Sequence, residues 1–137
     1  MLPPSGPASA AEAERSVTAT IDRIVDTIPH DSVLDMQNEA TVAPCVTDPS
    51  DVTISLRRLV TVDPALDRVA WFNTIRGLFS DPDEWSFRVR ALDTRDNLRM
   101  TVVGTDLSRF IILATGDVAA ARVSVSVDTQ CAPGETP

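Results

Sequence analysis

The sequence has no lysine, a single histidine and no apolar run long enough to span a membrane. All twelve of its basic residues are arginine, which codon bias in a GC-rich genome explains more simply than a phosphate site does. The longest apolar run, at residues 110–114, is far shorter than the roughly 18–20 residues that span a bilayer. We therefore expect no transmembrane segment in this chain.

The sequence also lacks the motifs of common catalytic and metal sites. His30 precedes Asp31 and Ser32, but neighbours in sequence do not make a catalytic triad, and no G-x-S-x-G motif is present. One histidine and two distant cysteines are too few for a four-ligand zinc site. The acidic clusters at 81–84 and 93–97 lack the glycine and distal glutamate of an EF-hand and are typical of turns. We expect no cofactor and no metal.

Acidic residues outnumber basic residues by 20 to 12, and this excess limits the classes of partner. The net charge is −8 and the isoelectric point is about 4.4. Nucleic acids and anionic membranes bind basic surfaces, so we expect neither as a nonspecific partner. The acidity favours solubility or a basic protein partner. A pair of carboxylates for glycoside hydrolysis is left open, because such a pair forms only in the folded chain.

Cysteine is scarce but even in number, with Cys45 and Cys131 far apart in sequence. A bonded pair indicates an oxidising compartment. We therefore predict a disulfide and an extracytoplasmic location: secreted, periplasmic, or anchored to the envelope through a removed N-terminal segment. Two reduced, buried cysteines in a cytosolic protein are the alternative. Residues 35–41 are polar and give no apolar signal-peptide core before Cys45, so we reject it as a lipidation site.

The length of 137 residues, with 43% hydrophobic residues, fits one domain with a real core. We expect a flexible leader at 1–9, which is rich in proline, serine and glycine. A single domain at 10–134 and a short tail at 135–137 complete the chain.

Two segments have the apolar spacing of helices. The first covers about residues 10–27 and ends at Pro29. The second is predicted to begin at Asp63 as N-cap with Pro64 in the first turn, and to end near Phe79. Its predicted buried side consists of Leu66, Val69, Phe72, Ile75 and Phe79.

The remaining segments have the alternation of strands. Short strands are expected at 33–36 and 40–46, and another begins at 52, with a bulge after Arg57 and Arg58 where Leu59 breaks the alternation. Four more, at about 85–91, 98–103, 110–115 and 122–127, are joined by short turns and form an antiparallel meander. The predicted fold is α+β, a two-layer sandwich in which two helices pack on one face of an antiparallel sheet of about five to six strands.

The alternation also fixes a register for the first hairpin of the meander. Pairing Ala91 with Leu98 places the apolar residues of both strands on one face, whereas a one-residue slip would mix them with arginines. In this register Arg90 lies opposite Arg99, and Arg88 opposite Thr101. Because like charges across strands repel, we expect an anionic group over them.

The third strand of the meander is apolar on both faces. If Phe110 and Ile112 face the helices, then Ile111 and Leu113 face outward beside Arg109. Apolar patches rimmed by polar residues mark contact sites. An ordinary solvated sheet face, or one covered by the leader or by residues 30–51, is the alternative. The predicted partner-binding residues are Arg88, Arg90, Arg99, Arg109, Ile111 and Leu113.

One sequence pattern resembles the soluble domains of actinobacterial cell-envelope lipoproteins of the mycobacterial type. It consists of a helix, a first cysteine, a tryptophan-bearing central helix, a meander, and a second cysteine followed by proline. These features are Cys45, Trp71, Trp85 and the stretch 128–133. The resemblance covers about residues 12–134, without the anchoring cysteine that such proteins carry. It implies an envelope location and a binding or accessory role, often in a larger membrane complex.

From these observations we expect a non-enzymatic, exported envelope domain that contacts a protein partner through the outer face of its sheet. A lipid or amphiphile carrier is a first alternative, and would need a cavity lined by Trp71, Phe72, Phe87 and Ile112. Further alternatives are an enzyme that uses acidic residues and an inhibitor or immunity-type protein whose acidity masks a basic target.

Overall fold

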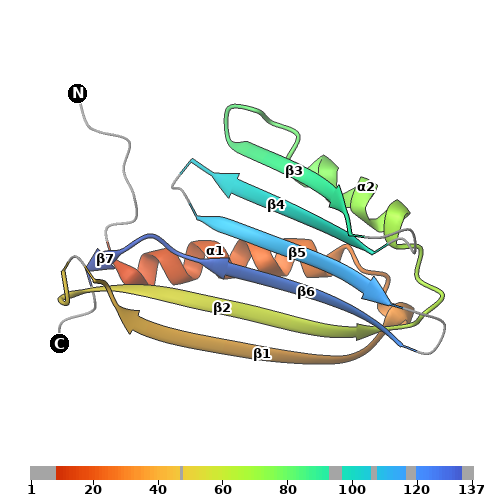
Figure 1. Cartoon of the computed structure of the whole chain (residues 1–137), viewed down its shortest axis with the longest axis horizontal. Helices are drawn as coiled ribbons and strands as arrows, with labels where there is room; N and C mark the ends of the chain where they lie inside the picture. The colour runs from red at the N-terminus through yellow and green to blue at the C-terminus, as the bar shows by residue number, and fades with distance from the viewer. Residues whose placement is uncertain (1–8, 47, 93–96, 106–107, 117–119, 134–137) are drawn as a thin grey trace.

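The chain folds into two layers, a twisted antiparallel sheet and two helices on one of its faces (Figure 1). The computed structural model describes residues 9–46, 48–92, 97–105, 108–116 and 120–133. The elements are α1 (Ala10–Asp26), the 3₁₀ turn η1 (His30–Ser32), β1 (Val33–Pro44), β2 (Asp51–Val62), α2 (Arg68–Leu78), β3 (Trp85–Ala91), β4 (Leu98–Gly104), β5 (Arg109–Gly116), β6 (Ala121–Asp128) and β7 (Ala132–Pro133).

The strand order in the sheet is β1-β2-β6-β5-β4-β3, and the short β7 pairs with the start of β2. The predicted α+β sandwich with two helices on one face is confirmed. The four-strand meander β3–β6 is also confirmed, and the hairpin β1–β2 joins it through β6. Residues 1–8 and 135–137, the larger part of the predicted leader and the tail, lie outside the described residues.

Helix α1 follows its sequence signals closely. The hydroxyl of Ser9 accepts a hydrogen bond from the backbone N–H of Glu12 and caps the helix. Val17, Ile21 and Ile24 are buried on one side of it, as the helical spacing of apolar residues predicts.

Helix α2 begins later than the sequence suggests. Asp67, not Asp63, is the N-cap, and its carboxylate accepts from the N–H of Ala70. The carboxylate of Asp63 instead accepts from Ala65 within a turn. The buried side of the helix consists of Arg68, Trp71, Phe72 and Ile75, whereas Val69 is 41% exposed, so its predicted burial is wrong.

The N-terminal hairpin also differs from prediction. The two expected short strands at 33–36 and 40–46 are one continuous strand, β1, paired along β2. β2 has no irregularity near Leu59 in its pairing with β1 or β6; the register shift lies between Val33 and Asp35. The alternation persists because Arg58 faces the helices, where it forms an ion pair with Asp22 of α1.

One continuous core lies between the layers. Trp71 donates from Nε1 to the hydroxyl of Thr27 at 2.7 Å, which ties α2 to the end of α1. Trp85 of β3 packs edge-on against both Phe79, which directly follows α2, and Phe110 of β5. These contacts hold both helices to the sheet.

The predicted disulfide joins Cys45 and Cys131, with Cα atoms 6.2 Å apart and a sequence separation of 86. It connects the end of β1 with the segment between β6 and β7. In the same region Thr129 exchanges bonds with Ile54: its N–H donates to the Ile54 carbonyl, and its hydroxyl accepts from the Ile54 N–H. The disulfide therefore links β1 to the C-terminal segment at one end of the sheet.

Removing the disulfide should lower the free energy of unfolding by about 2–4 kcal/mol, because a closed loop of this length restricts the unfolded chain. The Cys45→Ala/Cys131→Ala variant tests this by urea unfolding without reductant. Each single variant should lose as much as the double variant, since the bond needs both sulfurs. A wild-type chain that alkylates at two thiols without reductant would contradict the prediction.

Replacing Thr27 by valine should lower the free energy of unfolding by about 1–3 kcal/mol, because it leaves the buried indole N–H of Trp71 without an acceptor. Thr20→Val is the matched control: its hydroxyl bonds only to the carbonyl of Ser16 in the same helix. Thermal and urea unfolding measure both. Equal effects of the two substitutions would show that the bond to Trp71 adds nothing.

Candidate functional site

The face of the sheet opposite the helices carries the residues predicted to bind a partner. In the β3–β4 pairing, Arg90 lies opposite Arg99 and Arg88 opposite Thr101, so the predicted register is confirmed. β5 continues these rows, with Leu113 beside Arg99 and Ile111 beside Thr101. The structure therefore brings five of the six predicted residues into two adjacent rows, and Arg109 begins the next row opposite Val103.

The four arginines form a cluster that we call the arginine corner: Arg88, Arg90, Arg99 and Arg109. Arg88, Arg90 and Arg109 are exposed, and Arg99 is half-buried. None of the four guanidinium groups has an ion pair or side-chain hydrogen bond to another residue in the described part of the chain. The Nε atom of Arg99 is buried without a hydrogen-bond partner there. Such a donor is costly to leave unpaired.

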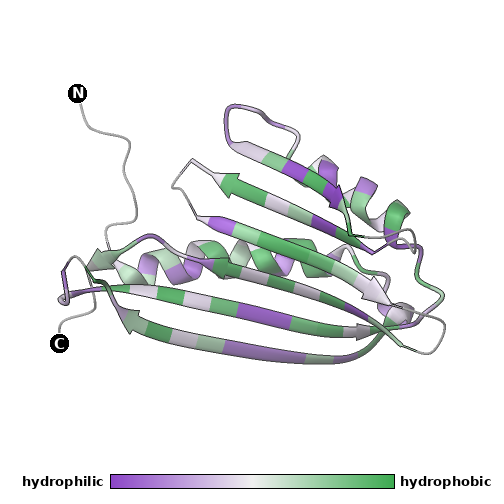
Figure 2. Cartoon of the chain, viewed as in Figure 1, coloured by the Kyte–Doolittle hydropathy of each residue, from purple (hydrophilic) through white to green (hydrophobic). Residues whose placement is uncertain are grey.

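The rest of the outer face has a different electrostatic character. Arg109 has Asp128 opposite it on β6, and on the far hairpin Arg57 has Glu39 opposite it. Polar residues recur along β1 and β2, whereas β5 is largely apolar (Figure 2). Arg88, Arg90 and Arg99 on β3 and β4 thus have no acid opposite them, and Arg122 of β6 lies opposite Thr61 and Thr115, on a chain whose net charge is −8.

Ile111 and Leu113 do face outward, but they are half-buried. Leu113 lies between Arg99 and Ser124, and Ile111 between Thr101 and Ser126. The hydroxyl of Ser126 donates to the carbonyl of Ile111 at 3.5 Å. Ile111 and Leu113 therefore form a narrow apolar strip, which we call the apolar floor. The aliphatic stem of Arg99 bounds it on one side and Ser124 and Ser126 bound it on the other.

A shallow pocket lies at the edge of the arginine corner. Its volume is about 290 Å³, and its lining consists of Ser86, Phe87, Arg88, Thr101 and Val103. It combines one cation, two hydroxyls and an apolar wall, which suits a short side chain that carries a carboxylate.

The segment at 30–51, one of the suggested covers for this face, is elsewhere. Residues 33–44 form β1, the edge strand of the sheet. This edge is the feature that the sequence analysis does not predict, because each half of the segment by itself has the pattern of a short strand. The alternation of Met36, Asn38, Ala40 and Val42 was its signal.

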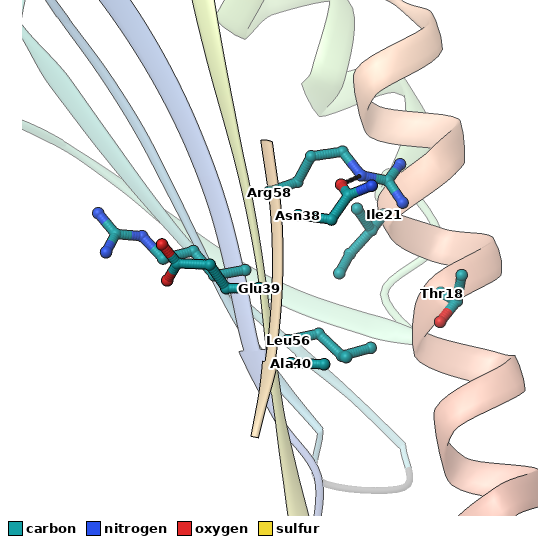
Figure 3. A pocket seen from close by; sticks show the side chains of 8 residues that line it. Thr18, Ile21, Asn38, Glu39, Ala40, Leu56 and Arg58 are labelled. Carbon is teal, nitrogen blue, oxygen red and sulfur yellow. Dashed lines mark hydrogen bonds between the residues drawn. The ribbon is translucent and has the colours of Figure 1, made fainter. Parts of the chain in front are cut away.

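A second pocket lies between this edge and α1, with a volume of about 180 Å³. Figure 3 shows Asn38 and Arg58 on its helix side, while Glu39 points to the opposite face of the sheet. Arg58 donates from Nε to Oδ1 of Asn38 at 2.8 Å.

The residues named for a lipid cavity belong to the packed core or to the surface. Trp71, Phe72 and Ile112 are at most 3% exposed and lie in the continuous core. Phe87 is 37% exposed on the edge strand β3, so the four do not enclose a common space. His30 is exposed in η1.

The part of the chain that the structure describes contains no cluster of three or more histidine, cysteine or acidic residues that could hold a metal ion. The acidic stretch at 81–84 forms a turn in which Asp81 accepts from the N–H of Asp83. Most of the stretch at 93–97 lies outside the described residues. Among the described helices, none has the length and apolar character needed to cross a membrane.

Comparison with known proteins shows a likeness in fold. No protein-family model matches the sequence, and no curated protein does. A crystal structure of a DUF4853 family protein from Actinomyces odontolyticus ATCC 17982, an actinobacterium, is similar with a TM-score of 0.53 and 10% sequence identity. The similarity covers 93% of this chain and 68% of that one. It shows that an actinobacterial protein shares this architecture.

Reversing one charge at the arginine corner should stabilise the fold. Arg90→Glu replaces a repulsive pair with an attractive one opposite Arg99, and should raise the free energy of unfolding by about 0.5–1 kcal/mol at low salt. Arg88→Glu, on the same strand and face but opposite Thr101, should gain less. In about 1 M NaCl, where the Debye length is about 3 Å, the gain should nearly vanish. A loss of stability from Arg90→Glu at low salt would contradict this.

Proposed function

We propose that this chain is a non-enzymatic, extracytoplasmic binding domain of the cell envelope, which contacts an acidic segment of a protein partner through the outer face of its sheet. The partner segment lies along the arginine corner and places its carboxylates between Arg88, Arg90 and Arg99. Its apolar side chains cover Ile111 and Leu113.

The observation that carries this proposal is the arginine corner itself. Arg90 and Arg99 face each other across two strands without an acid in their row of β3, β4 and β5. This arrangement costs folding free energy. A carboxylate that bridges the two guanidinium groups would remove the repulsion and supply a charge-assisted acceptor. Because binding relieves the repulsion between Arg90 and Arg99, that relief adds to the affinity for an acidic partner.

The shape of the surface supports a peptide-like ligand over a small molecule. The pocket beside Arg88 is shallow and open at the sheet edge, and the apolar floor of Ile111 and Leu113 is only partly accessible. Deep apolar cavities are typical of small-molecule sites. A flat face with arginines around a narrow aliphatic strip is typical of protein interfaces.

The location outside the cytoplasm is supported by the disulfide between Cys45 and Cys131, since such bonds persist in oxidising compartments. The envelope setting rests on the sequence resemblance to actinobacterial envelope lipoproteins, and an actinobacterial protein shares the fold. Acidic net charge keeps the rest of the surface from binding anionic lipids or nucleic acid, so the arginine corner is the place where an acidic partner is attracted.

Capture from envelope extract tests the proposal with a pair of variants that change charge equally. In Arg88→Glu/Arg90→Glu the altered residues are exposed on the outer face; in Arg15→Glu/Arg23→Glu they are exposed on α1. The first variant should lose a captured protein at least about tenfold, equivalent to about 1.4 kcal/mol. The second should retain it, and binding to wild type should weaken with added salt.

Equal retention of every captured protein by both variants would contradict binding at the outer face. Loss with both variants would show a general charge effect and would also contradict it.

A further inference from the structure

β1 presents a long and unprotected edge. It ends the strand order of the sheet and runs for 12 residues. Every residue after Val33 is exposed, with Leu34 at 62%, Met36 at 41% and Val42 at 61%. Proteins normally protect such edges with short strands, prolines or inward charges. Here the proline, Pro44, lies only at the end.

The backbone groups that point outward from this edge can be identified. The N–H and C=O of Ile54 both bond to Thr129, on the β6 side of β2, whereas the carbonyl of Asp51 accepts from Cys45 on the β1 side. The backbone N–H and C=O groups of successive residues point to opposite sides of a strand, so the odd-numbered residues of β2 bond to β1. Their partners in β1 are also odd-numbered. The even-numbered residues of β1 therefore point their backbone groups away from the sheet, at Met36, Asn38, Ala40 and Val42.

We propose that this edge pairs with the same edge of a second copy of the chain, antiparallel, with Asn38 on the two-fold axis. In this register Met36 lies opposite Ala40 of the second copy, and Val42 lies beside its Leu34. Met36 then acquires an apolar neighbour, and Val42 lies next to Leu34 at the register shift of β1. On the outer face Asp35 lies opposite Thr41 and Gln37 opposite Glu39, so no like charges face each other.

Neighbouring registers are less favourable for physical reasons. A shift by one residue would set outward-pointing backbone groups against inward-pointing ones and break the ladder. A shift by two residues in one direction places Glu39 opposite Glu39, and in the other places Asp35 opposite Glu39; both repel. A shift by four residues in the first direction sets Pro44, which has no N–H, against Met36, and in the other direction it pairs only residues 33–39 of β1. The Asn38 register avoids all of these.

The axis residue itself is self-complementary. Oδ1 of Asn38 accepts from Nε of Arg58, which holds the side chain on the helix side of the sheet (Figure 3). Its amide N–H₂ donates to no group within the described residues, and it would face the amide of the second Asn38. A polar pair at one central position fixes register in the way that buried asparagines do in helical dimers.

The other edge of the sheet disfavours self-pairing. Full overlap of two β3 strands would place Arg88 opposite Arg88, with Arg90 close by on the same face. These charges protect β3. The two edges thus differ: β1 accepts a second copy, and β3 repels one.

Pairing through β1 gives one continuous sheet with the two-fold axis perpendicular to it. Both pairs of helices then lie on one side and both arginine corners on the other. Because a single strand pair buries a small interface, the dimer should be weak, with a dissociation constant on the order of 10–1000 µM. The inference does not depend on what binds the arginine corner.

Site-specific crosslinking of the full chain tests the register. Opposed Cα atoms in a hydrogen-bonded antiparallel pair lie about 5.5 Å apart, within the range of about 4.4–6.8 Å that a disulfide spans. Asn38→Cys should therefore form a disulfide-linked dimer, with oxidised glutathione as the electron acceptor. Ala40→Cys is the control, because the two copies of residue 40 would lie about 13 Å or more apart. Non-reducing electrophoresis should show dimer at least about tenfold faster for the first variant.

The second measurement is the oligomeric state of a variant in which proline removes an outward-pointing backbone N–H of β1. Ala40→Pro removes an N–H that points away from β2, so the intrachain ladder stays intact while the ladder to a second copy is broken. Sedimentation at about 10–1000 µM should show a monomer–dimer equilibrium for wild type and for the control Ala40→Ser, and monomer for Ala40→Pro. Monomeric wild type at the highest concentration, or crosslinking of Ala40→Cys as fast as that of Asn38→Cys, would overturn the proposal.

Discussion

The pairing of β2 with β6 is the contact on which the rest of the structure depends. It joins the hairpin β1–β2, which comes early in the chain, to the last strand of the meander, from Ser55 with Asp128 to Val62 with Ala121. At one end of this seam Thr129 bonds to Ile54, and the disulfide joins Cys45 to Cys131. These contacts link distant parts of the sequence, so forming them costs the chain a large loop-closure entropy. Together they join the hairpin β1–β2 and the meander β3–β6 into one sheet.

The pairing of β2 with β6 also determines how charged side chains are distributed over the outer face of the sheet. In the N-terminal hairpin Glu39 lies opposite Arg57, and Asp35 lies opposite Thr61. β3 and β4 contribute arginines opposite each other or opposite threonine. Because β6 and β5 lie between these two groups, the acids of the hairpin stand several strands away from the arginine corner. With strands about 4.8 Å apart, they are too far to form ion pairs with it. The corner keeps its positive charge on an acidic protein.

Each edge of the sheet carries a different surface chemistry. β1 is long, uncharged on its helix-facing side and rich in exposed aliphatic residues, whereas β3 is short and carries Arg88 and Arg90. The helix layer explains part of this difference: Arg58 faces α1, where Asp22 pairs with it, and so the one inward cation near β1 is already neutralised. The sheet therefore has one edge that can extend and one that resists extension.

The sequence by itself determined the elements that local patterns encode. Alternation fixed β3–β6 and the facing of Arg90 and Arg99, helical spacing fixed α1, and the even number of cysteines indicated the disulfide. It failed where local signals competed: the turn at Asp63 looked like a helix cap, and Arg58 looked like a break in a strand whose partner, Asp22, is far away in sequence. Only the tertiary structure decided that residues 33–44 form an exposed edge and that Arg88, Arg90 and Arg99 have no acid opposite them. Both depend on which strands become neighbours, and that choice is made by packing and long-range pairing that no short window of sequence contains.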